Sequence, residues 1–286
     1  MELTPEEWHL TLDRLATALL EQTDLRQALK LFESQVPGLF HQIQLAGRAK
    51  SLLKLWGQSL NVDDNTGTLI VEPKILQVLS QLSGVPLDSP IVHAGVEHTY
   101  GYLLSLIETP YGKKRERWVN SYLEKALGLS RPMFAPVVPQ GTLLTNLTYF
   151  LGRIQFRGRR SELGYLRRSR ELVDQALTQL NYRQMKPKRI IEEIGHGRKQ
   201  IRLVTDLLEL PEVKGMEELR GLLIYGVEKT STKRHQLITT FPVTEQTFDE
   251  LLSQPLGENV PIQIKYNCYL EGFNREPLDG MRLIVE

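Results

Sequence analysis

The apolar positions of the first sixty residues repeat with the period of an α-helix. The segment 4–7 (TPEE) is a capping box with proline at the first helical position, which marks a helix start. The apolar residues that follow at spacings of four, three and four share one helical face: Trp8, Leu12, Leu15 and Leu19. Two further amphipathic stretches begin near Asp24 and Pro37. The pattern predicts a helical bundle, or a helical cover, over residues 1–60.

Beyond Gly57 the pattern becomes mixed. The run 68–71 (TLIV) has β character, and residues 90–107 are rich in β-branched and aromatic residues, which predicts a strand. Helices are expected over 73–82, 114–127 and 143–151. Together these elements predict a first α+β lobe over residues 61–156.

The second half divides into a helical part and a β-rich part. Apolar residues at helical spacing run from 161 to 181, and a helical pair is expected at 187–194 and 198–209, so the segment 157–216 is predicted to be helical. Residues 217–286 are predicted to form a β-rich lobe with strands at 219–228, 234–241, 259–270 and 281–285 and a short helix at 245–253. The expected fold is α+β: an N-terminal helical bundle, then mixed α/β lobes with an antiparallel sheet and an Arg-rich helical segment between them.

The net charge of +1 conceals an uneven distribution. Between Arg153 and Arg202 fourteen Lys/Arg residues stand against five acids, which gives +9, while the rest of the chain carries −8. Eleven of the fourteen are arginine, the side chain suited to bidentate phosphate contact, so the block predicts an RNA partner. The residues expected to contact RNA here are Arg159, Arg160 and Arg167.

Several classes of protein are excluded by what the sequence lacks. The single cysteine, Cys268, rules out an internal disulfide framework and fits a cytoplasmic location. No apolar run is long enough to span a membrane. Motifs for P-loop, dinucleotide and serine-hydrolase sites are absent, so no cofactor is expected. His93 and His98 would face opposite ways on the predicted strand, so no metal site is expected either.

Histidine and hydroxyl groups remain as candidates for catalysis. His98 lies on the predicted 90–107 strand, and His235 opens the predicted 234–241 strand. Cleavage of RNA without a metal needs a base, an acid and a cation beside the phosphate. His98 and His235 would supply the acid and base, and Lys114 is a candidate for the cation.

Three patches resemble the uridylate-specific endoribonuclease (EndoU) family. They are 95–100 (GVEHTY), 118–125 (WVNSYLEK) and 238–242 (ITTFP), 19 residues in all. The resemblance implies a two-lobed α+β fold, with the first catalytic histidine on a strand. It also implies metal-independent cleavage of single-stranded RNA at uridines, leaving 2′,3′-cyclic phosphate ends.

The resemblance assigns roles to particular positions. His98 matches the first catalytic histidine, Thr239 the hydroxyl residue and Phe241 the aromatic residue that helps to hold uracil, and Tyr100 is expected beside the substrate. The family's second histidine is replaced by Glu116, and Arg131 lies in the region of its lysine. His235 is expected to take the place of the missing histidine.

Two alternatives explain the same features. The first is a non-catalytic adaptor, in which the N-terminal helices bind a protein partner and the Arg-rich helices bind nucleic acid. The second is a small-molecule enzyme with a pocket among Tyr100, Tyr102, Arg117 and Trp118. A pocket that held His98 beside His235 would favour the ribonuclease, whereas separated histidines would favour the adaptor.

Overall fold

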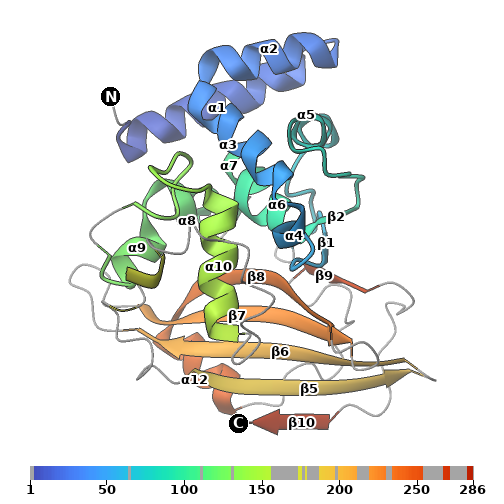
Figure 1. The fold of residues 1–286 in the computed structure, drawn as a ribbon, viewed down its shortest axis with the longest axis vertical. Helices are drawn as coiled ribbons and strands as arrows, with labels where there is room; N and C mark the ends of the chain where they lie inside the picture. The colour runs from blue at the N-terminus through green and yellow to red at the C-terminus, as the bar shows by residue number, and fades with distance from the viewer. Residues whose placement is uncertain are drawn as a thin grey trace.

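Helices occupy one end of the molecule and a twisted antiparallel sheet the other (Figure 1). The computed structural model describes residues 3–63, 66–109, 112–129, 132–155, 173–175, 178, 187–196, 199–210, 219–229, 234–253, 267–270 and 282–285. Within these residues the predicted α+β class, with N-terminal helices and a later antiparallel sheet, is confirmed.

The predicted N-terminal helices are present. They are α1 (Pro5–Glu21), α2 (Leu25–Gln35), α3 (Pro37–Arg48) and the single turn α4 (Lys50–Leu53). The capping box closes at the start of α1, where the Thr4 side chain accepts from the Glu7 amide and the Glu7 carboxylate accepts from the Thr4 amide. Asp24 caps α2 by accepting from the Gln27 amide at 2.8 Å. Each cap satisfies amides that have no partner within the helix.

Seven further helical segments lie within the described residues between 73 and 155. They are α5 (Pro73–Ser83), α6 (Ala94–Val96), the π-helical turn η1 (Glu97–Gly101), α7 (Tyr102–Leu104), α8 (Glu116–Val119), α9 (Tyr122–Ala126) and α10 (Leu143–Gln155). One cluster of buried apolar side chains runs without interruption from α1 to α10 and on to one face of the sheet. Residues 1–60 and 61–156 therefore share a core, and the boundary proposed between them stays a prediction.

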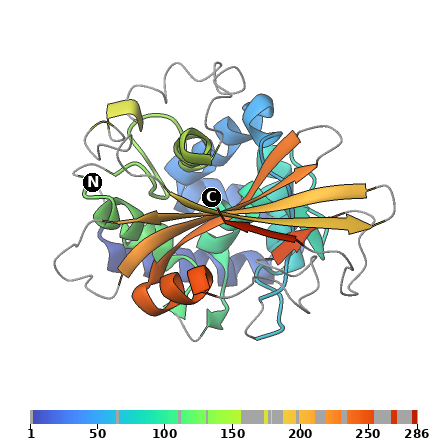
Figure 2. The ribbon, with the colours of Figure 1, turned by 90° about the horizontal axis from the view of Figure 1, so that it is seen from below.

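The large sheet has five antiparallel strands in the order β10-β5-β6-β7-β8. The strands are β5 (Lys188–His196), β6 (Lys199–Glu209), β7 (Leu219–Lys229), β8 (Arg234–Thr244) and β10 (Arg282–Val285). The helix α10 packs on one face, and α12 (Glu245–Ser253) covers the other through Phe248 (Figures 1 and 2). Both faces of the central strands are consequently buried.

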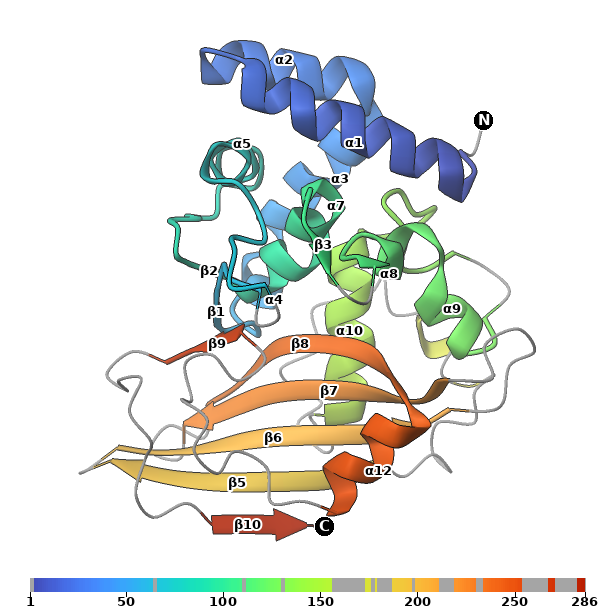
Figure 3. The ribbon, with the colours of Figure 1, turned by 180° about the vertical axis from the view of Figure 1, so that it is seen from behind.

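Two small sheets complete the helical end. The strand β1 (Gln58–Leu60) lies between β2 (Ile91–His93) and β9 (Cys268–Tyr269), and β3 (Glu108–Thr109) forms a hairpin with β4 (Gly112–Lys113). Figure 3 shows β9 beside β1 at the junction of helices and sheet. The segment before β1 also covers the outer edge of β8, because the Leu237 amide donates to the Leu55 carbonyl at 2.7 Å and the Leu237 carbonyl accepts from the Gly57 amide at 2.8 Å.

The predicted helices at 187–194 and 198–209 are wrong. These residues form the hairpin of β5 and β6. Ile201, Leu203 and Leu207 face the α12 side of the sheet while Leu208 faces α10, so a strand buried on both sides gives a nearly continuous apolar run. Such a run matches helix and strand templates equally well. Of the remaining predicted helical segment, residues 173–175 and 178 are helical, and most of the rest lies outside the described residues.

The strand predicted over 90–107 is also wrong, except at β2. Residues 94–104 are helical, with a π-helical turn at 97–101. Gly95 lies directly against the Trp56 indole: a Cβ at this position would be 2.7 Å from the ring. Close packing explains the glycine, and burial of the neighbouring aromatic residues outweighs their preference for strands.

Three smaller predictions also need correction or restriction. The run 68–71 forms no strand, and the 114–127 helix is interrupted at Ser121, whose φ is +53°. In the predicted 259–270 strand, only 267–270 are described, and β9 lies there. Among the described residues, none of the helices is both long and apolar enough to cross a membrane.

Replacing Gly95 by alanine should destabilise the fold. The added methyl group would meet an indole that cannot easily withdraw, because its Nε1–H donates to Thr148 Oγ1 at 2.8 Å. We expect the free energy of unfolding to fall by about 1–3 kcal/mol, as in other overpacked cores. Urea denaturation would measure it, with the exposed helical Gly38→Ala as control, since its Cβ would meet only a Val137 methyl group at 3.1 Å. Equal stability of Gly95→Ala and wild type would contradict this packing argument.

Candidate functional site

The residues predicted to carry chemistry lie in different parts of the structure. His98 and Lys114, from the helical end, meet Phe241 of β8 around a shared tyrosine, Tyr102. His235 lies near the other end of β8 in a separate network. The remaining predicted arginines lie outside the described residues: Arg131, Arg159, Arg160 and Arg167.

Tyr102 lies at the centre of a group of aromatic and basic side chains. Its ring centroid is 5.0 Å from that of His98 and 5.5 Å from both Lys114 Nζ and the Arg117 guanidinium carbon. The same guanidinium carbon lies 5.1 Å from the centroid of the Phe241 ring. These five residues are called the Tyr102 cluster below.

Arg117 joins the helical end to the sheet. It extends from α8 to β8, where its guanidinium donates to the Thr240 carbonyl at 3.3 Å, and it lies between the rings of Tyr102 and Phe241. Among the described residues, no carboxylate forms an ion pair with it, and its side chain is partly exposed. Burial lowers the pKa of Arg117, and the nearby Tyr102 and Asp63 counteract part of that effect. The guanidinium remains a cation in a poorly hydrated setting.

Lys114, expected to be the catalytic cation, has a carboxylate partner. Its ammonium lies 2.7 Å from Asp63 Oδ2, and the Asp63 side chain is almost completely buried. The other oxygen of that carboxylate accepts from the Thr66 amide at 3.0 Å. Lys114 therefore forms a direct ion pair, whereas Arg117 forms none within the described residues.

His98 lies on the π-helical turn and is buried with an adjacent carboxylate. Its Nε2 is 3.3 Å from Glu97 Oε2, which also accepts a hydrogen bond from Ser59 Oγ. Neither imidazole nitrogen makes a hydrogen bond of good geometry within the described residues, and the residue is 3% exposed. Tyr102 covers one side of the ring. His98 and Glu97 form a buried pair, and substrate cannot reach His98 in this conformation.

His235 belongs to a different network. Its Nε2 is 2.7 Å from Gln155 Oε1, at the end of α10, and the residue is 7% exposed. Gly226 on β7 leaves the space for this contact, because a Cβ there would be 2.7 Å from His235 Nε2. His235 and Phe241 lie six positions apart on β8, roughly 20 Å at the usual strand rise. The structure therefore does not bring His235 into the Tyr102 cluster.

Two further predicted site residues are buried in the interior. Tyr100 is 1% exposed within the helical core, and burial raises its pKa above the ordinary value. Thr239 is 4% exposed and lies opposite Tyr225 in the sheet. Neither side chain is available to a ligand in this conformation.

Sequence reasoning missed the partners that decide what these residues can do. Glu97 could have been found from its position next to His98, whereas Asp63 lies among turn-forming residues that carry no signal of a buried ion pair. Gln155 carries no local signal, because its role arises only when α10 docks on the sheet. Among the described residues, no group of three or more His, Cys, Asp or Glu could hold a metal ion.

Comparison with known proteins returns no match to any family model, curated protein or solved structure. The resemblance to uridylate-specific endoribonucleases thus stays a prediction from three short patches. One expectation drawn from it is wrong, since His98 lies on a helical turn and not on a strand.

His93 gives a pH-dependent prediction beside this site. Its Nε2 lies 2.9 Å from the Leu53 carbonyl and its Nδ1 accepts from the Val96 amide, an arrangement that requires the neutral ring. Burial lowers the pKa of His93 below its ordinary value of 6.5, and proximity to His98 lowers it further. Below pH 6.5 His93 therefore binds a proton in the unfolded chain more readily than in the folded chain. The free energy of unfolding consequently falls as the pH decreases.

We expect the titration of His93 to lower the free energy of unfolding of the wild type by roughly 1 kcal/mol between pH 7 and pH 5. His93→Asn keeps an acceptor for the Val96 amide and removes the titration, so its pH profile should be flatter. Denaturation at several pH values would measure both, with the exposed His41→Asn as the control. Parallel profiles for His93→Asn and wild type would exclude this role of His93.

Proposed function

We propose that this chain binds single-stranded RNA at the Tyr102 cluster and does not cleave it. The observation that carries the proposal is Arg117, a partly exposed residue. Its guanidinium lies near the Tyr102 and Phe241 rings, and no carboxylate within the described residues forms an ion pair with it. A cation beside a partly exposed aromatic ring, here that of Phe241, is a combination by which proteins contact the phosphates and stack on the bases of single-stranded nucleic acids.

The remaining described basic residues support this location. Arg189 pairs with Asp206, Arg202 with Glu193, and Arg153 with Asp174. These pairs offset much of the positive charge in the described part of the basic block. Arg117 stands out because its positive charge is held by aromatic rings and a carbonyl.

The placement of the histidines supports binding over cleavage. Transesterification needs an acid and a base on opposite sides of one phosphate. His98 and His235 belong to different networks, and both are more than 90% buried. The criterion set out from the sequence, that separated histidines favour a non-catalytic protein, therefore points to a binding role.

Replacing Arg117 should weaken RNA binding. We expect Arg117→Gln to raise the Kd for a fluorescent oligouridylate by about tenfold, the loss of one stacked, charged contact. Arg117→Lys keeps the charge but loses the planar stacking and should have an intermediate effect. Fluorescence anisotropy in EDTA at about 50 and 200 mM salt would measure the affinities, and wild-type binding should weaken with salt.

The exposed Arg14→Gln on α1 removes the same charge elsewhere and serves as the matched control. Circular dichroism would verify that each variant is folded. Equal affinity of Arg117→Gln and Arg14→Gln would remove the Tyr102 cluster from consideration. Cleavage of the oligonucleotide in EDTA that is lost in His98→Ala would instead support the ribonuclease.

A further inference from the structure

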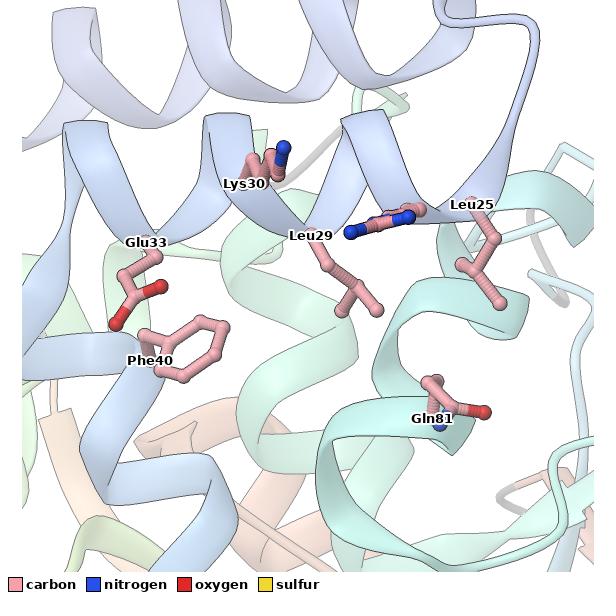
Figure 4. Close-up of a pocket in the computed structure, with 7 residues that line it drawn as sticks. Leu25, Leu29, Lys30, Glu33, Phe40 and Gln81 are labelled. Carbon is pink, nitrogen blue, oxygen red and sulfur yellow. The ribbon is translucent and has the colours of Figure 1, made fainter.

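A solvent-open groove lies among the N-terminal helices, remote in sequence from most of the Tyr102 cluster. It has a volume of about 430 Å³ and lies between α2, α3 and α5 (Figure 4). Its lining residues come from all three helices: Leu25, Arg26, Leu29, Lys30, Glu33, Phe40 and Gln81. The groove shares no residue with the Tyr102 cluster, so the two can be tested independently.

The floor of the groove is apolar. Leu25 and Leu29 are one helical turn apart on α2, and Phe40 of α3 lies beside them, with its ring centroid 6.2 Å from that of the buried Phe32. The three side chains pack against the main core but remain partly exposed. Figure 4 shows Leu25 and Leu29 directed from α2 towards α5. The apolar stripe of α2 thus extends beyond the part that the core buries, and its edge lines the groove.

The rim of the groove is positively charged. Arg26 and Lys30 are exposed on α2, and neither forms an ion pair within the part of the chain that the structure describes. Residues 5–48 contain four Lys/Arg and six Asp/Glu, so these helices are acidic as a whole. Two of the four cations nevertheless lie on this rim, where Glu33 is the single acidic lining residue. The local charge is opposite in sign to that of the surrounding helices.

We propose that this groove docks an acidic amphipathic helix of a protein partner. Apolar side chains one turn apart on such a helix would insert between Leu25, Leu29 and Phe40, which is the usual arrangement for a helix in a groove. Carboxylates flanking them would meet Arg26 and Lys30, so that the rim selects the sign of the partner's charge.

Charge also argues against two other occupants. A symmetric pair of these chains would place the same cationic rim on both sides of the contact, which like-charge repulsion disfavours. The groove floor offers a single aromatic ring, that of Phe40, and Glu33 closes one end, so it lacks the successive stacking surfaces that single-stranded nucleic acid uses.

The probe for the test is a labelled synthetic peptide of about 16 residues, long enough to form a helix. It carries leucines one turn apart and glutamates on their flanks. Two control peptides replace the glutamates by lysine or the leucines by alanine. Fluorescence anisotropy would compare the three peptides on the full chain, and we expect measurable binding of the acidic leucine peptide alone.

Variants of the protein locate the binding. Leu29→Asp and the double variant Arg26→Glu/Lys30→Glu should each raise the Kd of the acidic peptide by about tenfold or more. Leu10→Asp places the same charge at an exposed leucine outside the groove, and Arg14→Glu/Arg48→Glu makes the same change in net charge at exposed arginines. These matched variants should bind like the wild type, and circular dichroism would confirm that all are folded. The double reversal keeps the test valid if Leu29→Asp fails to fold.

Several results would overturn the proposal. Equal binding of the glutamate and lysine peptides would refute the role of the cationic rim. Unchanged affinity of the double reversal would remove the peptide from this groove. Sedimentation of the wild type as a dimer that Leu29→Asp converts to a monomer would assign the groove to a second copy. Loss of RNA binding in Arg117→Gln leaves all of these outcomes unaffected.

Discussion

Gln155, at the end of α10, is central to the contacts that hold the helices on the sheet. Its amide group donates to the Val204 carbonyl of β6 at 3.2 Å and to the Ile224 carbonyl of β7 at 3.3 Å, and its side-chain oxygen contacts His235 of β8. Its own carbonyl accepts from Arg189 of β5 at 2.8 Å. A single residue thus contacts four consecutive strands. Because these groups are buried, loss of the side chain would leave buried polar groups without partners, which costs more than the bonds themselves contribute.

The two proposed surfaces depend on this arrangement to different degrees. The Tyr102 cluster exists because α8 and β8 are held close enough for Arg117 to reach the Thr240 carbonyl. The groove between α2, α3 and α5 lies among helices that the sheet does not contact directly, so it depends on packing within the helical end. The geometry of the Tyr102 cluster therefore depends on the junction between helices and sheet, and that of the groove depends on the helices alone.

Local signals in the sequence predicted the elements that carry them. Caps at Thr4 and Asp24 and the stripe of α1 located the N-terminal helices, and strands were expected at 219–228 and 234–241, where β7 and β8 lie. Prediction failed where tertiary contacts decide. The hairpin of β5 and β6 is buried on both faces, so its apolar pattern has no unique period. Gly95 is helical because Trp56 packs against it, and nothing near Gly95 in the sequence indicates that contact. His98 and Phe241 were identified as candidates. Their contacts with Tyr102 and Arg117 could not be predicted, because these contacts too arise only from the tertiary fold.

The small sheet around β1 has a consequence for how the chain reaches its native state. Ser59 pairs with Val92 on one side and with Cys268 on the other, a partner roughly two hundred positions later. During synthesis from the N-terminus, one edge of β1 therefore stays open until nearly the whole chain has emerged. Contacts of such long range slow folding, and the open edge of β1 is a place where a nascent chain can pair wrongly. The helical end, although early in the sequence, is therefore complete only after β9 has emerged.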